Sequence, residues 1–395
     1  MNTKTLITPA DRITKLPKYI FVELDEMKCA AKKNGIEFID LGIGNPDGCT
    51  AEPIVEAAVC SIRDPKSHGY PAFRGKKELR DSIAGWMKSR YDVTIDPENE
   101  IQVLTGAKEG LALTAFAFTN PGDINIVPDP YYPVLARGTW ASGGETYHIP
   151  LLPENKFLPD IDAIPEEIAE KAKVFIINYP NNPTGAIAPR EFLEKVVAFC
   201  RKHSILLLSD LAYGEVCFGD YRPLSIFNIE GAKEIAVEIH SWSKTFNMAG
   251  WRAGFVTGRK EFIEAIFAMK TNLDYGTPTV VQDAATKALQ MDYSYVVPTM
   301  KKYEERRDIL VEKLAELGWE VDPPKATMYF WLPTPNNEPS MDFCKRLLKE
   351  AGVVVTPGIA FGQGSDKYFR ISTVQPKELL IEAMERMKKA GIRYQ

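Results

Sequence analysis

The segment from residue 241 to residue 254 reads Ser241-Trp-Ser-Lys244-Thr-Phe-Asn-Met-Ala-Gly-Trp-Arg252-Ala-Gly254. It directly follows the apolar run Ile235–Ile239, which predicts a buried strand, so Lys244 is expected just past a strand end. A lone lysine in a loop is usually a solvated surface residue, but here two serines, a lysine and an arginine stand together among small residues. Hydroxyls and a guanidinium form charge-assisted hydrogen bonds to a phosphate, and an amine desolvated near a cation is neutral enough to attack an aldehyde. The segment therefore predicts a phosphate site beside an amine nucleophile.

Short apolar runs of the same kind recur along the chain. Six of them predict buried strands, at Ile101–Leu104, Ile124–Val127, Val174–Ile177, Ile205–Leu208, Ile235–Ile239 and Gly254–Thr257. Between these runs, Arg190–Lys202 places apolar residues at helical spacing, so we expect a helix that covers one face of a sheet. The alternation of strands and helices favours an α/β fold with a mostly parallel sheet.

The pattern changes after about Ala284, where a smaller α+β unit is expected. Its predicted parts are a long charged helix at Tyr293–Leu317, an apolar run at Met328–Leu332, an exposed loop at Pro333–Pro339, a helix near Ser340–Lys349 and an apolar run at Val353–Thr356. We therefore expect an N-terminal arm with part of the small domain at residues 1–45, a large domain at 46–288 and a small C-terminal domain at 289–395.

Two further motifs follow predicted strands. One reads Tyr179-Pro-Asn-Asn182-Pro-Thr-Gly185, and the other reads Ser209-Asp210-Leu-Ala-Tyr213. Alone, the first is simply a turn, and an isolated aspartate at a strand end is more often a helix cap. Carboxyl ends of parallel strands meet at one edge of a sheet. One shared site is therefore expected for four residues that stand at strand ends: Asn182, Asp210, Lys244 and Arg252.

Together these motifs resemble those of the class I/II aminotransferases of fold type I, which use pyridoxal 5′-phosphate (PLP). The resemblance includes the S-x-S-K-(x)7-R-x-G pattern and extends from about residue 11 to the C-terminus. It implies a three-layer α/β/α fold and a ping-pong transfer of an amino group between an L-amino acid and a 2-oxo acid. It also implies that Lys244 binds the cofactor covalently and moves the proton between substrate Cα and cofactor C4′.

The resemblance also implies contacts to the cofactor ring. Asp210 would pair with the pyridinium nitrogen, while Asn182 and Tyr213 would form hydrogen bonds to the phenolic oxygen. A carboxylate against the ring nitrogen keeps it protonated, so that the ring accepts the electrons released when the Cα–H bond breaks. The phosphate would be held by two hydroxyls, a guanidinium and two backbone N–H groups, from Ser241, Ser243, Arg252, Ala107 and Lys108.

Three earlier segments add to this set. In Thr105-Gly106-Ala107-Lys108-Glu109-Gly110 a strand leads into an apolar helix, whose N-terminus would point at the phosphate. Tyr132 of Asp129-Pro-Tyr-Tyr132-Pro matches the family position whose ring stacks on the cofactor. Without the resemblance, a tyrosine in such a segment would be interpreted as a core residue. Tyr70 of His68-Gly-Tyr70-Pro-Ala-Phe-Arg-Gly75 matches the tyrosine that reaches the phosphate of the neighbouring subunit, which implies a homodimer.

Substrate contacts are implied as well. Arg370 of Phe369-Arg370-Ile-Ser matches the arginine that holds the substrate α-carboxylate, and Gly44 of Leu41-Gly-Ile-Gly44-Asn-Pro-Asp47 would bring backbone close to the same group. The remaining substrate positions implied are Tyr19, Lys108, Tyr132 and Asn182. A partner residue near Asp274–Thr279 would read the far end of the substrate.

The motifs match two branches of the family. Four segments resemble the alanine (glutamate–pyruvate) transaminases: Ile13-Thr-Lys-Leu-Pro-Lys-Tyr19, Gly44-Asn-Pro-Asp-Gly48, Asp274-Tyr-Gly-Thr277 and Pro324-Lys-Ala-Thr-Met-Tyr329. The run Val353-Val-Val-Thr-Pro-Gly358 also resembles LL-diaminopimelate aminotransferases. The main expectation is exchange between alanine–pyruvate and glutamate–2-oxoglutarate. The alternatives are diaminopimelate transamination and a PLP-dependent lyase of the same fold.

Composition excludes several other classes. A net charge of −5 over 395 residues provides no basic field for nucleic acid or an anionic membrane, which also disfavours a DNA-binding regulator of this fold. Six scattered cysteines without a C-x-x-C pair argue against a disulfide framework and favour a reducing cytosol. Four scattered histidines predict no metal cluster, and no G-x-G-x-x-G follows an early strand, which disfavours a Rossmann dehydrogenase.

Overall fold

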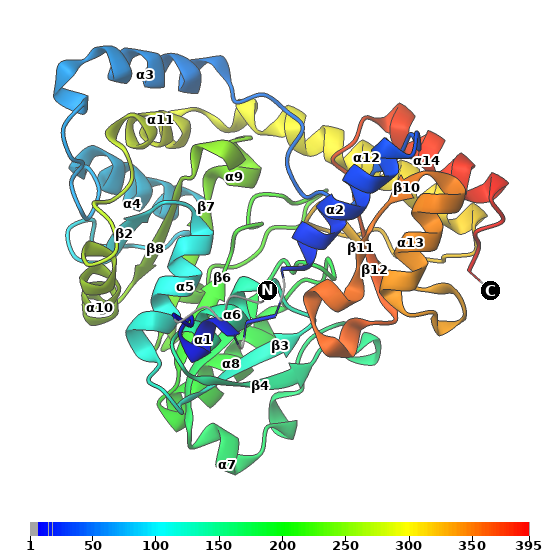
Figure 1. The fold of residues 1–395 in the computed structure, drawn as a ribbon. Helices are drawn as coiled ribbons and strands as arrows, with labels where there is room; N and C mark the ends of the chain where they lie inside the picture. The colour runs from blue at the N-terminus through cyan, green and yellow to red at the C-terminus, as the bar shows by residue number, and fades with distance from the viewer. Residues whose placement is uncertain (1–6, 15, 18, 395) are drawn as a thin grey trace.

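The computed structural model describes residues 7–14, 16–17 and 19–394. Its centre is a seven-stranded sheet in the order β2-β8-β7-β6-β5-β3-β4 (Figure 1). The strands are β2 Ile101–Leu104, β3 Ile124–Asp129, β4 Glu145–Pro150, β5 Ala172–Asn178, β6 Leu206–Asp210, β7 Ala236–Ser241 and β8 Gly254–Gly258. The pairings from β4 through β3, β5 and β6 to β7 are parallel, whereas β8 runs antiparallel to both of its neighbours.

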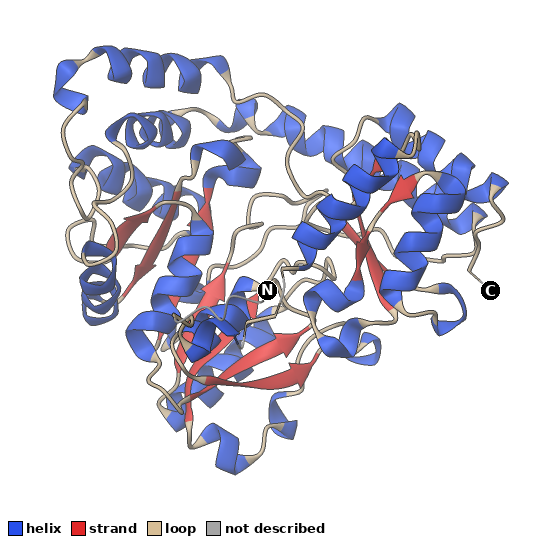
Figure 2. Cartoon of the chain, in the orientation of Figure 1, coloured by secondary structure: helices blue, strands red, loops and turns tan. Residues whose placement is uncertain are grey.

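Helices cover both faces of this sheet (Figure 2). One face carries α5 Ala107–Phe118, α6 Val134–Ala141 and α10 Lys260–Thr271, and the other carries α3 Glu52–Arg63, α4 Lys77–Tyr91, α8 Arg190–His203 and α11 Thr279–Gln290. In β5, Val174 and Ile176 belong to the first core, while Phe175 and Ile177 belong to the second. Because both faces are buried at the centre of the sheet, a central strand such as β5 is a continuous apolar run, from Val174 to Ile177, rather than an alternating one. The short helices α7 Glu166–Ala169 and α9 Trp242–Thr245 lie in connections.

The C-terminal part forms a second, smaller α+β unit. It has an antiparallel sheet in the order β11-β12-β9 and a parallel pair of β1 with β10. The elements are β1 Ile39–Asp40, β9 Tyr329–Pro333, β10 Val353–Val354, β11 Thr356–Pro357, β12 Tyr368–Ser372, α12 Val297–Glu316, α13 Ser340–Ala351 and α14 Lys377–Lys389. Ile39 and Leu41 are buried in the same core as Phe343 and Met384. An N-terminal segment therefore completes this unit, whereas the boundaries at 45/46 and 288/289 stay a prediction.

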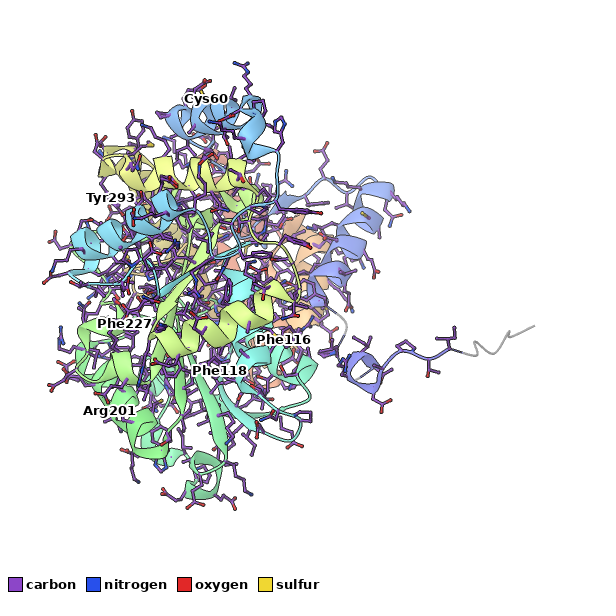
Figure 3. The ribbon with its side chains drawn as sticks, turned by 90° about the vertical axis from the view of Figure 1, so that its left-hand side faces the viewer. Cys60, Phe116, Phe118, Arg201, Phe227 and Tyr293 are labelled. Atoms are coloured by element: carbon purple, nitrogen blue, oxygen red, sulfur yellow. The ribbon has the colours of Figure 1, made fainter. Side chains whose placement is uncertain are left out.

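Two N-terminal helices precede β1. Helix α2 spans Ile20–Lys33, and α1 spans Asp11–Thr14 with no buried residue. Helix α1 contacts α6 but stands out from the rest of the molecule in the side view (Figure 3). In the same view, Cys60 of α3 and Arg201 of α8 lie at opposite ends of the molecule. All six cysteines are free. None of the helices in the described ranges has the length and apolar composition needed to cross a bilayer.

The predicted α/β fold is confirmed, with corrections to single elements. Strand β6 ends at Asp210, so this residue belongs to the strand, and Lys244 lies in the one-turn helix α9 rather than in a loop. The long helix begins only at Val297, because Pro298 has no N–H and is accommodated in a first turn. The run Val353–Thr356 is divided between two sheets, as β10 and part of β11.

Two further features differ from the predictions. Strand β4 was not predicted, since it lies at the sheet edge and includes the polar residues Glu145, Thr146 and His148. The loop at Pro333–Pro339 exposes Asn336 and Asn337 but buries Thr334, so it is only partly exposed.

Candidate active site

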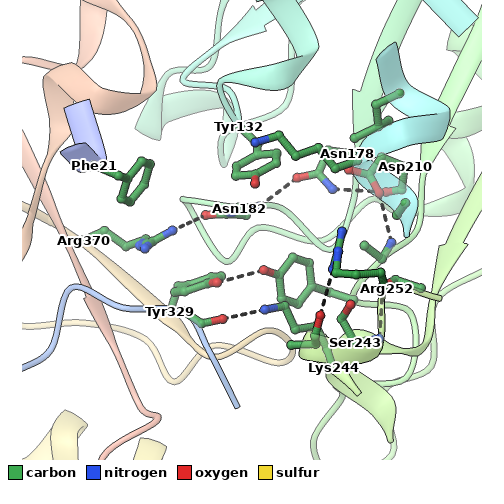
Figure 4. Close-up of a pocket in the computed structure, with 18 of the residues that line it drawn as sticks. Phe21, Tyr132, Asn178, Asn182, Asp210, Ser243, Lys244, Arg252, Tyr329 and Arg370 are labelled. Carbon is green, nitrogen blue, oxygen red and sulfur yellow. Dashed lines mark hydrogen bonds between the residues drawn. The ribbon is translucent and has the colours of Figure 1, made fainter. Parts of the chain in front are cut away.

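A cavity of about 330 Å³ lies where β5, β6 and β7 end at their carboxyl sides (Figure 4). This volume lies within the range of small-molecule sites. Thirteen of the residues assigned from the sequence line it: Tyr19, Gly44, Ala107, Lys108, Tyr132, Asn182, Asp210, Tyr213, Ser241, Ser243, Lys244, Arg252 and Arg370. The fold thus brings together side chains from both sheets and from the N-terminal segment.

One end of the cavity offers donors to an anion. Helix α5 begins at Ala107, so the N–H groups of Ala107 and Lys108 have no carbonyl partner within the helix, whereas that of Glu109 donates to the Gly106 carbonyl at 3.1 Å. Arg252 lies against this turn, and any side chain at Gly106 would collide with its guanidinium. Gly106 has φ +85°, a backbone conformation that favours glycine. Glycine therefore suits this position both because of its backbone conformation and because there is no room for a side chain. The Arg252 Nη1 donates to the Ala249 carbonyl at 2.8 Å, which fixes the side chain at this end.

The two serines beside Lys244 differ in role. The Ser241 hydroxyl accepts a hydrogen bond from the Ser243 N–H at 3.1 Å and caps α9. Ser243 is buried and also lines the cavity. A cap at this point fixes the first turn of α9, which carries Lys244.

Asp210 is a buried carboxyl group at the end of β6. Its Oδ1 accepts the Ala212 N–H at 3.1 Å. Burial raises the pKa of Asp210 to about 6, against the lowering effects of that N–H and of His240. A buried carboxylate is stabilised by a cationic partner, and a protonated ring nitrogen is such a partner.

Asn178 holds the ends of two strands together and was not singled out from the sequence. Its Nδ2 donates to the Asp210 carbonyl at 3.1 Å, and its Oδ1 accepts the Asn182 N–H at 2.9 Å. The only sequence signal is its place four residues before Asn182 at the end of a strand.

Lys244 lines the cavity from the one-turn helix α9. Its Nζ donates to the Gly44 carbonyl at 2.5 Å. Burial lowers the pKa of Lys244, and the charges of Arg370 and Arg252 act in the same direction, while Tyr329 opposes them. A lowered pKa increases the neutral amine fraction at neutral pH, as nucleophilic attack requires.

Arg370 lies within the cavity with only 2% of its surface exposed. Its two terminal nitrogens donate at 2.8 Å to Asn182 Oδ1 and to the Gly42 carbonyl. Its Nε is buried and has no hydrogen-bond partner among the described residues. Buried polar groups are normally paired, so this donor suits a planar acceptor such as a carboxylate.

Two cations lie against the ring of Tyr19, which lines the cavity. Lys108 Nζ and the Arg137 guanidinium lie 5.0 and 4.7 Å from the centre of the Tyr19 ring. Tyr132 and Phe21 also line the cavity. The motif at 13–19 includes Lys15 and Lys18, which lie outside the described residues. Phe21 was missed, and its two-residue separation from Tyr19 was the only available signal.

Tyr70 does not line the cavity of its own chain in the described structure. It is 81% exposed, and its ring stacks on that of Tyr275 with centroids 4.3 Å apart. Its assignment to a phosphate site across a subunit interface stays a prediction.

Comparisons with known proteins identify the family of this chain. The family model described as aminotransferase class I and II matches residues 36–387. The LL-diaminopimelate aminotransferases of Syntrophobacter fumaroxidans and Aquifex aeolicus are 46% and 45% identical to this chain, each over 96% of it and 98% of the relative. The substrate-bound structure of BacF from Bacillus subtilis superposes with a TM-score of 0.94 at 40% identity, covering 98% of this chain and 99% of that one.

The chain belongs to the class I and II aminotransferases. It is a PLP-dependent enzyme with the fold-type I architecture. The cavity fits PLP in three respects: donors for a phosphate at α5, a buried carboxylate at Asp210, and an amine at Lys244. Between the two branches that the motifs matched, the similarity favours the diaminopimelate one over the alanine one.

Proposed function

We propose that this protein is an LL-diaminopimelate aminotransferase that uses 2-oxoglutarate as amino acceptor. The support is the identity of 46% to a full-length relative of that name, together with Lys108, which lines the cavity and whose ammonium lies 5.0 Å from the centre of the Tyr19 ring. The main expectation from the sequence motifs, alanine–pyruvate exchange, is the rival.

The reaction requires a proton to leave the substrate Cα. Bound PLP supplies a ring that accepts the electrons of that bond. Lys244 Nζ would take the proton from Cα and return it to the cofactor side of the substrate, and burial, which lowers the pKa of this amine, would favour the neutral form that accepts a proton. Asp210 would keep the proton on the ring nitrogen. Arg370 holds the α-carboxylate through a planar pair of hydrogen bonds and so orients the Cα–H bond toward Lys244.

The far end of diaminopimelate carries a carboxylate and an amine. Lys108, 5.0 Å above the Tyr19 ring, is the cation that would meet the far carboxylate, and the same cation suits the second carboxylate of glutamate. Asp210 is the only acid among the cavity-lining residues in the described part of the chain, and the ring nitrogen uses it. We therefore propose that the far amine finds its acceptor on the partner subunit of a homodimer, near Asp274–Thr279.

Specificity constants test this function. Purified, PLP-loaded enzyme is assayed with LL-diaminopimelate, alanine and glutamate as donors. A polar site built for the longer substrate discriminates by about 10⁴-fold, so kcat/KM for LL-diaminopimelate is expected to exceed that for alanine by up to that factor. Equal or better use of alanine would favour the alanine–glutamate reading instead.

A variant makes the test specific for the far end. Lys108→Met keeps the backbone N–H that faces the phosphate but removes the ammonium. It is expected to lower kcat/KM for LL-diaminopimelate by roughly 10²-fold, as for a lost charge-assisted hydrogen bond, and to change that for alanine little. Equal losses with both donors would show that Lys108 does not read the far group.

A further inference from the structure

Tyr329 belongs to the cavity, yet none of the assigned roles uses it. It is the first residue of β9 and is 3% exposed. Its hydroxyl lies 2.8 Å from the hydroxyl of Tyr213, and its ring centre lies 4.1 Å from the guanidinium carbon of Arg370 (Figure 4). One side chain thus touches a proposed cofactor contact and the proposed substrate anchor.

Strand pairing explains this position. Strands β9 and β12 are antiparallel with Tyr329 opposite Ser372, and Arg370 is two residues away along β12. Side chains at 329, 370 and 372 therefore point to the same face of the small sheet, where diagonal neighbours are within reach of long side chains. On its other side the Tyr329 hydroxyl meets the backbone of Gly44, where any side chain would collide with it. The hydroxyl is held between Tyr213 and the segment that carries the carbonyl partner of Lys244.

The two hydroxyls share a limited number of protons. Each tyrosine hydroxyl donates one hydrogen bond and accepts up to two. Burial raises the pKa of Tyr213 far above its usual value, so this phenol keeps its proton. If Tyr213 directs that proton to the phenolic oxygen of PLP, the bond within the pair must be donated by Tyr329. Hydrogen bonds in such a chain polarise one another and strengthen by roughly 10–30% each.

We propose that Tyr329 is a positioning residue: its hydroxyl donates to Tyr213 and so directs the Tyr213 proton at the cofactor's phenolic oxygen, while its ring supports Arg370 beneath the substrate carboxylate. The proposal rests on the PLP-dependent activity and on the role assigned to Tyr213. Tyr329→Phe removes only the hydroxyl, and Tyr329→Leu also removes the ring.

Spectroscopy separates the hydroxyl's role from a structural one. In PLP-loaded enzyme, the visible band of the cofactor shifts with pH, and the midpoint reports the proton held beside the phenolic oxygen. Weaker donation to that oxygen makes its anionic form less stable, so the proton is retained to higher pH. Tyr213→Phe is expected to raise the midpoint, because it removes the donor to the phenolic oxygen. Tyr329→Phe is expected to raise the midpoint by only a few tenths of a pH unit, because Tyr213 still donates and only the strengthening of its hydrogen bond by Tyr329 is lost.

The matched control is Tyr179→Phe. Tyr179 is also buried, and its hydroxyl donates to one neutral acceptor, the Phe157 carbonyl at 2.7 Å, but it does not line the cavity in the described structure. Its midpoint should equal that of the wild type. In the Tyr213→Phe background the effect of Tyr329→Phe should vanish, because the hydroxyl then has no tyrosine to act through.

Each outcome has a distinct meaning. A wild-type midpoint in Tyr329→Phe, or an undiminished shift in the Tyr213→Phe background, would overturn the hydroxyl's role. A wild-type midpoint in Tyr213→Phe would overturn the assignment of Tyr213 itself, which is a separate failure.

Kinetics test the ring and do not depend on the spectral shift. Tyr329→Phe should lower kcat severalfold and keep the KM for the amino donor within about twofold, since the ring remains under Arg370. Tyr329→Leu should raise that KM roughly tenfold. Equal KM values in the two variants would overturn the ring's role.

Discussion

The two ends of the cavity are built in different ways. At the phosphate and ring end, the residues stand at the ends of β5, β6 and β7 and at the start of α5, within one sheet and its covering helix. At the substrate end, they come from the segment before α2, the turn around Gly44, β9 and β12. Hydrogen bonds between adjacent strands set the positions of the residues at the first end. The second exists only where the N-terminal segment and the small sheet pack against the large one.

This difference suggests a division of labour. The ring end would serve the same proton transfer for any amino acid, because its proposed contacts are to the cofactor and Cα alone. The substrate end selects which amino acid enters, and small changes in packing alter it. Variants at the two ends should therefore differ in what they change: turnover and cofactor spectra at one, KM and donor choice at the other.

The largest expected effect is at the ring end. Lys244→Ala should lower kcat by at least about 10⁴-fold for every donor, because one residue provides both the cofactor link and the proton transfer. Borohydride reduction followed by peptide mass spectrometry should find the cofactor on Lys244 in the wild type and on no lysine in the variant. Recovery of the adduct on another lysine would contradict the assignment.

The substrate end is tested by Arg370. Arg370→Lys keeps the charge but loses the planar fork, so it should raise the KM for all amino donors roughly 10²-fold. Cofactor affinity and the visible band should change little, since they depend on the other end. A large loss of PLP affinity in this variant would show that the two ends are not separable.

A pH-dependent stability effect is expected at Asp210 in the cofactor-free protein. Burial raises the pKa of Asp210 from 3.8 to about 6, so the folded state binds its proton more tightly than the unfolded chain does. This contribution to stability is fully present below about pH 4 and is lost as pH rises to about 6, an effect of roughly 3 kcal/mol. The free energies of unfolding of the wild type and of Asp210→Asn are measured by urea unfolding across this pH range. The difference between their pH dependences gives the contribution of Asp210. Equal pH slopes would contradict the expectation, and PLP should reduce the wild-type loss.

The smallest expected signal concerns the partner subunit. Tyr70→Ala and Lys244→Ala chains, each nearly inactive, are mixed to form hybrid dimers. If Tyr70 acts across the interface, one site of each hybrid carries both defects and the other neither, so about a quarter of the wild-type activity should return after random mixing. Verified hybrids without recovery would place Tyr70 in its own subunit's site or make it structural.

Much of the ring end could be predicted from the sequence because its signals are local. The runs that became β5 and β6 are largely apolar on both faces, that of β7 is apolar on the face of Val237 and Ile239, and the motif residues stand within a few positions of the strand ends. Boundaries shifted by one or two residues, as for Asp210 in β6, because the ladder with β5 and β7 decides where pairing stops. Polar edge strand β4 carried no such signal.

The sequence by itself determined the class of chemistry: an amine, a carboxylate and phosphate donors at successive strand ends require only that parallel strands place their carboxyl ends together. The tertiary structure alone decided the hydrogen bond of Lys244 to Gly44, the pairing of Tyr329 with Tyr213, and the position of Tyr329 beneath Arg370. Those contacts join residues far apart in the chain, and their distances depend on strand register and on the packing of two sheets. No local pattern of residues encodes such distances, because they are set by the whole core at once.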